Sequence, residues 1–298
     1  TAEMYAIPPS SERYGTTETI IGNWFKARGN RDQVILASKI AGPGLPWIRD
    51  GQNKIDKENI LKAVEGSLGR LQTDYIDLYQ LHWPNRGSYH FGQVWKFDPQ
   101  FDAQAEQDNF LEVLQTLQGL IQQGKIRHIG LSNETAWGMS KWLQIAKDEN
   151  LPRMASIQNE YSLLCRNFEP DLSEMAIHEE CGLLAWSPLA RGILSGKYLD
   201  GARPVGARLT LETRPEHRLG DQLDPATRKY IELAKRYDLD PCQMALAFVN
   251  SRAFVSSTLI GATNMDQLRS NIDSVSLTLS DEVLKEIHKI RRQYPMPF

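Results

Sequence analysis

The sequence predicts an α/β protein of the (β/α)8 TIM-barrel class, with six of the eight strands present in the chain. Short β-branched and apolar runs alternate with longer segments of helical periodicity, which is typical of parallel strands joined by helices. An open, doubly wound sheet would carry a G-x-G-x-x-G turn after an early strand, and Gly42-Pro43-Gly44 breaks that pattern. Polar residues also follow the predicted strands at one end, where barrel enzymes place their active sites.

The strands are expected in segments of apolar, β-branched composition, at 34–39, 75–82, 126–132, 154–159, 183–187 and 256–260. Helices are expected at 56–71, 110–123, 137–149, 171–180, 225–237, 265–272 and 280–292. In the first of these helices Asp56 suits the N-cap position, and Ile60, Val64 and Leu68 recur at helical spacing. Strands that alternate with helices in this way form a parallel sheet with the helices outside.

Composition limits the class of protein. The chain has 298 residues, is 41% hydrophobic and carries a formal net charge of −3; we interpret residues 1–298 as a single domain. A nearly balanced charge argues against a nucleic-acid partner, and no apolar stretch approaches the roughly 20 residues that span a bilayer. Cys165, Cys181 and Cys242 lack metal-ligand spacing, which indicates reduced thiols in a cytoplasmic protein without a metal site.

Residues that suit a functional site stand at the carboxyl ends of successive strands. They are Lys39, His82, Ser132 with Asn133, Gln158, Trp186 with Ser187, and Gly261. In a closed parallel barrel these ends form the mouth of the active site. One such residue could be a strand end that meets solvent. Six strand ends in register favour a functional site.

Five segments together resemble the aldo-keto reductase superfamily, and the resemblance runs from Thr1 to about Gln293. The segments are Thr1-Ala2-Glu3-Met4-Tyr5, Ala37-Ser38-Lys39, residues 74–84, residues 124–133 and residues 186–192. The loop after Lys39 and the Trp-Ser-Pro-Leu-Ala run resemble the bacterial Tas-type branch, which is related to potassium-channel β subunits. In this family an aspartate precedes the first motif. The resemblance therefore implies a preceding segment with that catalytic Asp, two strands and a helix, about 50 residues. The sequence does not distinguish between a segment that the structure leaves out, a chain expressed in shortened form and a truncated gene.

The resemblance implies reduction of a carbonyl by hydride transfer, which requires a proton donor and charge stabilisation at the oxygen. Tyr5 would be the general acid, Lys39 would lower the Tyr5 pKa, and His82 would orient the carbonyl. A nearby ammonium favours the phenolate and so lowers a tyrosine pKa from its usual value near 10. Each residue alone has an ordinary structural interpretation, and the ordered set favours catalysis. The sequence has no G-x-S-x-G elbow of serine hydrolases and no zinc-ligand spacing.

The resemblance also implies NADPH as the cofactor. Ser132, Asn133 and Gln158 would bind the nicotinamide carboxamide, and Trp186 would stack on the ring. The loop over the pyrophosphate would be formed by Ser187, Leu189, Ala190, Arg191 and Lys197. The adenosine side would be formed by Gly261, Thr263, Gln267 and Asn271, near a helix N-terminus. Many family members have Lys, Arg and Glu where this chain has Gly261, Gln267 and Ser270. Arg208 is then the leading candidate to hold the 2′-phosphate, and the preference for NADPH over NADH rests on the resemblance alone.

Several alternatives remain open at this point. The loop from Trp83 to Gln107 is rich in aromatic residues, namely Trp83, Tyr89, Phe91, Trp95, Phe97 and Phe101. It could line an apolar pocket for a small carbonyl substrate or pack against a second subunit. The sequence is therefore compatible with a homo-oligomer. The competing function is an NADP(H)-binding regulatory or interaction protein with slow turnover. A non-functional remnant is the third alternative.

Overall fold

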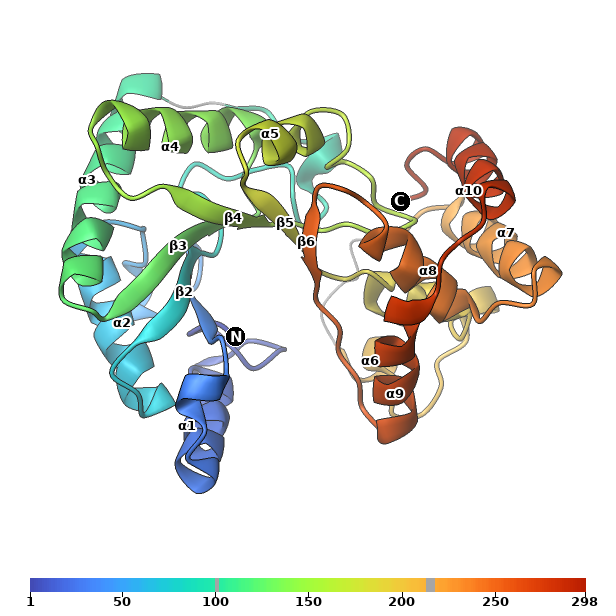
Figure 1. Cartoon of the computed structure of the whole chain (residues 1–298), viewed down its shortest axis with the longest axis horizontal. Coiled ribbons are helices and arrows are strands. Elements are labelled where there is room, and N and C mark those ends of the chain that lie inside the picture. Colours follow the sequence, from blue (N-terminus) through green and yellow to red (C-terminus); the bar gives the residue numbers. More distant parts are fainter. Residues whose placement is uncertain (100–101, 213–217) are drawn as a thin grey trace. The chain divides into compact units, whose positions relative to one another are not determined.

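The computed structural model describes residues 1–99, 102–212 and 218–298, so Phe101 of the aromatic loop lies outside the described residues. Two compact units can be distinguished by their internal contacts, Thr1–Ile157 and Gln158–Phe298, and Figure 1 shows the elements of each. A single domain over residues 1–298 stays a prediction. The α/β class and the six parallel strands expected from the sequence are confirmed.

The strands of unit 1 are β1 (Ala37–Ile40), β2 (Ile76–Leu81), β3 (Ile126–Ser132) and β4 (Met154–Gln158), which ends at the unit boundary. They lie side by side in chain order. β2 pairs in parallel with β1, where Lys39 is opposite Gln80, and with β3, where Leu81 is opposite Leu131. Residues of β2 are buried almost without interruption, as expected for a strand covered on both faces. This register brings the carboxyl ends of β1, β2 and β3 to one edge.

The helices of unit 1 are α1 (Thr16–Arg28), α2 (Lys57–Leu71), α3 (Ala103–Gln122) and α4 (Ala136–Asp148), with short 3-10 helices at Ser11–Arg13, Arg31–Gln33, Arg49–Gly51 and Gln93–Trp95. In Figure 1, α2, α3 and α4 lie along the outer side of the strands. Side chains of Asp56, Asp102 and Thr135 accept hydrogen bonds from backbone N–H groups in the first turns of α2, α3 and α4. These caps satisfy donors that a helix leaves free at its start. Because of the Asp102 cap, α3 begins at Ala103 and not at the expected residue 110.

Helix α1 was not expected from the sequence, because its buried positions do not form an apolar stripe. The residues it buries are Glu18, Gly22 and Phe25, whereas Ile20 and Trp24 are exposed. Gly22 lies against α2, where an added Cβ would come within 2.3 Å of the Arg70 carbonyl oxygen. Hydrophobic periodicity cannot predict a helix that packs through a glycine and a carboxylate.

Unit 2 has β5 (Gly182–Ala185) paired in parallel with β6 (Val255–Thr258). Its helices are α5 (Leu172–His178), α6 (Arg208–Leu211), α7 (Leu223–Arg236), α8 (Pro241–Asn250), α9 (Met265–Asp273) and α10 (Asp281–Gln293), with 3-10 helices at Ala190–Ser195, Leu199–Gly201 and Ser274–Ser276. Helix α8 was also missed from the sequence. Six consecutive residues from Met244 to Val249 are buried, so α8 is apolar on every side and carries no 3.6-residue signal. None of the helices within the described ranges is long and apolar enough to cross a membrane.

Candidate active site

Tyr5 and His82 meet at the edge formed by the ends of β1 and β2. The segment 1–5 runs beside β1, where the Glu3 N–H donates to the Lys39 carbonyl at 3.1 Å. Within the segment, the Tyr5 N–H donates to the Ala2 carbonyl at 3.1 Å. His82 follows β2, and its N–H donates to the Ile40 carbonyl at 3.0 Å. The Tyr5 Oη lies 3.4 Å from the His82 Nε2. The two rings are edge-to-face, with centroids 5.5 Å apart. Tyr5 and His82 can therefore contact the same substrate atom.

Lys39 lies on β1 beside this pair. Its side chain is buried, and its Nζ is 5.6 Å from the centroid of the Tyr5 ring. Burial lowers the pKa of Lys39 from 10.5 to about 8, with the Glu18 carboxylate acting in the opposite direction. Burial and then the charge of Lys39 lower the pKa of His82 well below 6.5. The imidazole is therefore neutral near pH 7, and the site pairs a neutral histidine with a titratable ammonium.

Ser132 and Asn133 complete the edge at the end of β3, and both are buried. Asn133 adopts a left-handed φ of 53°, a conformation that Asn tolerates better than most residues. Its Nδ2 donates to the His82 carbonyl at 2.8 Å and to the Ser132 Oγ at 3.1 Å. Unit 1 therefore brings together five of the residues expected from the sequence, from three different strand ends and the segment 1–5.

A buried ion pair behind Asn133 was not foreseen from the sequence. The Arg86 guanidinium bonds to the Glu134 carboxylate, and each side chain is 3% exposed. The guanidinium also lies over the rings of Phe110, at 5.6 Å, and Trp137, at 5.0 Å. Arg86 and Glu134 are 48 residues apart, so no local pattern could have indicated the pair.

In unit 2, Gln158 ends β4 and Trp186 follows β5. The N–H of Trp186 donates to the Asn159 carbonyl at 3.1 Å. The Arg218 guanidinium lies 5.8 Å from the Trp186 ring, and its Nε donates to the Glu160 carboxylate at 2.6 Å. The Arg218 side chain is fully buried. Sequence reasoning missed Arg218 and Glu160, whose separation of 58 residues leaves no local signal.

The segment expected to fold over the pyrophosphate has an unusual backbone. Ser187, Ala190 and Arg191 have φ values of 54°, 46° and 59°, and such a chain can turn successive N–H groups toward an anion. Leu189 accepts the Gly192 N–H at 2.8 Å within this turn. Arg191, however, donates to the Glu212 carboxylate at 3.1 Å. The cationic groups expected for phosphate that stay exposed are Lys197 and Arg208.

The residues expected on the adenosine side form a local network at the start of α9. The Gln267 Oε1 accepts from the Thr263 N–H at 3.0 Å and from its hydroxyl at 3.1 Å. Asn264 caps α9 by accepting from the Gln267 N–H at 2.9 Å. Asn271 donates to the Gly261 carbonyl at 3.4 Å. These expected residues therefore lie together, with the Gln267 amide oxygen already bonded to Thr263.

Comparison with known proteins shows the family. The aldo/keto reductase family model matches residues 1–292. The chain is 48% identical to Protein tas of Escherichia coli strain K12, over 99% of this chain and 85% of that protein. It is 30% identical to a putative voltage-gated potassium channel subunit beta of Schizosaccharomyces pombe, over 99% of this chain and 80% of that protein. It is 29% identical to norsolorinic acid reductase stcV of Emericella nidulans, over 91% of this chain and 64% of that protein.

The chain belongs to the aldo/keto reductase family, and it is an oxidoreductase. The resemblance inferred from the ordered motifs, including that to the Tas-type branch and to channel β subunits, is confirmed.

Proposed function

We propose that this protein reduces an aldehyde or ketone to an alcohol by hydride transfer from NADPH, with Tyr5 as the general acid. The observation that carries the proposal is the grouping of Tyr5, Lys39 and His82, with the Tyr5 Oη 3.4 Å from the His82 Nε2 and the Lys39 Nζ 5.6 Å from the Tyr5 ring. A half-buried phenol beside a buried ammonium and a buried neutral imidazole suits a reaction that builds negative charge on an oxygen.

The proton chemistry follows from these three groups. Because the His82 imidazole is neutral, a proton on Nε2 can be donated as a hydrogen bond to the substrate oxygen without transfer. The charged form of Lys39 favours the phenolate of Tyr5 and so makes the Tyr5 Oη a stronger proton donor. The Tyr5 Oη then gives its proton to the oxygen as the carbonyl is reduced.

The chemical groups of the residues expected at the cofactor suit a nicotinamide dinucleotide. NADPH, when bound, would supply the hydride. Ser132, Asn133 and Gln158 offer the hydroxyl and amide groups that match a carboxamide, and Trp186 offers a ring face for stacking. The backbone around Ser187, Leu189, Ala190 and Arg191, with Lys197 and Arg208, would bind the phosphates, with Arg208 at the 2′-phosphate. Gly261, Thr263, Gln267 and Asn271 would contact the adenosine.

The proposal is tested by titrating the full-length protein with NADPH and NADH while following tryptophan fluorescence, and then by following NADPH oxidation with 4-nitrobenzaldehyde. We expect saturable quenching, tighter for NADPH than for NADH, and steady turnover of the aldehyde. A folded protein that binds neither nucleotide would contradict the proposal. Arg208→Ala should weaken the binding of NADPH and leave that of NADH unchanged, because only NADPH carries the 2′-phosphate.

A second candidate is an NADP(H)-binding regulatory subunit, which the 30% identity to a putative potassium channel subunit beta supports. The turnover number separates the two: typical enzymes turn over at about 1–1000 per second, and tight NADPH binding with turnover far below that range favours the regulatory role.

We further propose a small carbonyl substrate, a cytoplasmic location in keeping with the free thiols of Cys165, Cys181 and Cys242, and no membrane or nucleic-acid partner. The aromatic loop from Trp83 to Gln107 would be the contact surface if the protein forms a homo-oligomer.

A further inference from the structure

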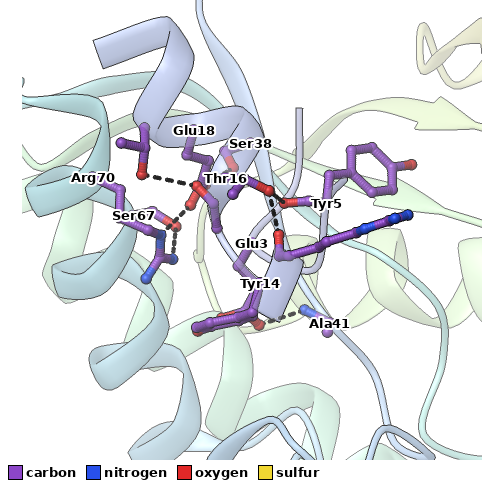
Figure 2. Close-up of polar contacts among 12 residues, drawn as sticks. Glu3, Tyr5, Tyr14, Thr16, Glu18, Ser38, Ala41, Ser67 and Arg70 are labelled. Atoms are coloured by element: carbon purple, nitrogen blue, oxygen red, sulfur yellow. Dashed lines mark hydrogen bonds and ion pairs between the residues drawn. The ribbon is translucent and has the colours of Figure 1, made fainter. Parts of the chain in front are cut away.

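The carboxylate of Glu3 occupies a buried position two residues before Tyr5. Its exposure is 0%, and it accepts four hydrogen bonds. One comes from the Ala41 N–H at 2.7 Å, one from the Tyr14 hydroxyl at 2.9 Å, and two from the Arg49 guanidinium, at 2.8 and 3.0 Å. Figure 2 shows Glu3 between Tyr14 and Ala41, with the Tyr5 ring extending away from them. A carboxylate taken so fully out of water is held by its partners.

The backbone of Glu3 joins the same elements as its side chain. Its N–H donates to the Lys39 carbonyl at 3.1 Å, and its carbonyl accepts from the Gly15 N–H at 2.8 Å. Lys39 and Ala41 lie on either side of the last residue of β1. Glu3 therefore binds the end of β1 twice, through its backbone N–H at Lys39 and through its carboxylate at Ala41. The chain then turns into Tyr5, whose carbonyl accepts from the Thr17 N–H at the start of α1 at 3.4 Å. Glu3 thus fixes the segment that carries the Tyr5 phenol relative to the strand that carries Lys39.

Arg49 extends this link to the loop after β1. Arg49 and Asp50 have φ values of 50° and 55°, a conformation that costs energy for residues other than glycine. The two bonds to Glu3 hold this turn in place. Leu45 and Trp47, from the same loop, pack with Tyr5 against one apolar cluster. Releasing Arg49 would therefore loosen side chains that pack against the same cluster as Tyr5.

We propose that Glu3 is a positioning residue. Its two hydrogen bonds with Arg49 and its bond with the Ala41 N–H hold the Tyr5 phenol in place beside Lys39 and His82. This inference rests on the proposed function, because Tyr5 must be the proton donor for its placement to affect the rate. Arg49 neutralises the charge of Glu3, so Glu3 acts by fixing geometry. The Tyr14 hydroxyl is the third anchor. Burial first and then the Glu3 charge raise the Tyr14 pKa to about 12, so Tyr14 stays a neutral donor.

The test is Glu3→Gln in the full-length protein. The new amide keeps an oxygen for the Ala41 N–H but turns N–H groups toward the N–H groups of Arg49. We expect kcat with 4-nitrobenzaldehyde to fall by at least about tenfold, because small displacements of a reacting group cost that much or more. The Kd of NADPH, measured by tryptophan fluorescence, should stay within about twofold of wild type, a change worth less than 1 kcal/mol.

A second readout needs neither cofactor nor substrate. In protein labelled with 13C at tyrosine Cζ, the Tyr5 resonance, assigned by its loss in Tyr5→Phe, gives the Tyr5 pKa directly. Glu3→Gln should raise this pKa, because a displaced phenol feels the Lys39 ammonium less. Asp77→Asn is the matched control: its carboxylate also bonds two arginines, Arg31 and Arg127, and a backbone N–H, but at the opposite end of β2. It should lower the melting temperature and leave kcat and the Tyr5 pKa unchanged.

The inference is overturned if Glu3→Gln keeps the wild-type kcat and Tyr5 pKa, or if Asp77→Asn lowers kcat as much at an equal loss of stability. Should Glu3→Gln fail to fold, Arg49→Lys gives the same comparison, because it keeps the charge and loses the two-pronged geometry. Arg49→Lys is expected to lower kcat in the same direction. Failure of the proposed function is separable, because it would appear as wild-type protein that does not oxidise NADPH with any carbonyl tested.

Discussion

The Nζ of Lys39 lies 5.6 Å from the centroid of the Tyr5 ring. The ammonium is buried, and its pKa is lowered to about 8. Because this ammonium loses its proton near pH 8 and lies next to the proposed proton donor, we expect the rate of reduction to depend on pH around that value.

The pH profile of reduction should follow Lys39. As the pH rises through about 8, the ammonium loses its charge and no longer lowers the pKa of Tyr5, so kcat/KM for NADPH-dependent reduction should fall. Lys39→Met should have a low kcat/KM that does not fall further as the pH rises through this range. It should also be at least as stable as wild type near pH 7, because burial disfavours the charged lysine in the folded state. Steady-state rates from pH 6 to 10 and thermal denaturation measure both effects, and a wild-type-like fall in the mutant would contradict the assignment.

Asp77→Asn should destabilise the protein most clearly at neutral pH. Burial raises the pKa of Asp77, but the Leu36 N–H and Arg31 outweigh it and hold the pKa below 3.8. The resulting stabilisation is present above the unfolded pKa and is lost as the pH falls through the lower folded value. We expect a loss of about 2 kcal/mol at pH 7 that shrinks below about pH 4, measured by urea denaturation. Equal losses at pH 7 and pH 3 would count against this explanation.

Glu134→Gln should be strongly destabilising, because it leaves the buried Arg86 charge without its partner. Breaking a buried ion pair costs about 3 kcal/mol or more, and the affinity for NADPH should fall because Asn133 is the preceding residue. Replacing both partners, with Arg86→Met and Glu134→Leu together, should cost less than the single change. Glu58→Gln, which breaks the exposed pair with Lys62, is the control and should have no measurable effect on unfolding. A double change that costs more than Glu134→Gln would contradict this explanation.

Tyr79→Phe should leave stability equal to wild type or raise it. The Tyr79 side chain is fully buried, and its hydroxyl has no hydrogen-bond partner among the described residues. Removing an unsatisfied buried hydroxyl can gain about 1 kcal/mol. Chemical denaturation measures the change, and a loss of more than about 1 kcal/mol would show that the hydroxyl has a partner in the folded protein.

The sequence was sufficient to predict the elements that bury a regular apolar surface. The strands could be recognised because short runs rich in apolar and β-branched residues alternate with longer segments of helical periodicity. Helix α1 could not be, because it packs through Glu18 and Gly22. Helix α8 could not be, because its apolar residues face every direction. The start of β1 was placed too early for a related reason: Ile35 is apolar but 86% exposed.

The sequence was sufficient to predict that the side chains of the candidate site lie together, but not which residues support them. Tyr5, Lys39 and His82 could be located because the motif order and the strand ends agree. The ion pairs around the site join distant segments of the chain: Glu3 and Arg49 are 46 residues apart. Such pairs follow from the register of the strands and the path of the loops. Arg191 was expected to bind phosphate, and its bond to Glu212 depends on a loop whose path no pattern indicated.

The most direct test of the central claim compares Tyr5→Phe with Tyr79→Phe for NADPH oxidation with 4-nitrobenzaldehyde. Both changes remove one phenolic hydroxyl. The Tyr5 Oη lies 3.4 Å from the His82 Nε2, whereas the Tyr79 hydroxyl has no hydrogen-bond partner among the described residues. Tyr5→Phe should bind NADPH as wild type does and lose about 100-fold or more in kcat, whereas Tyr79→Phe should keep its rate. If Tyr5→Phe turned over like wild type, Tyr5 would not be the proton donor and the proposed carbonyl-reduction centre would be contradicted.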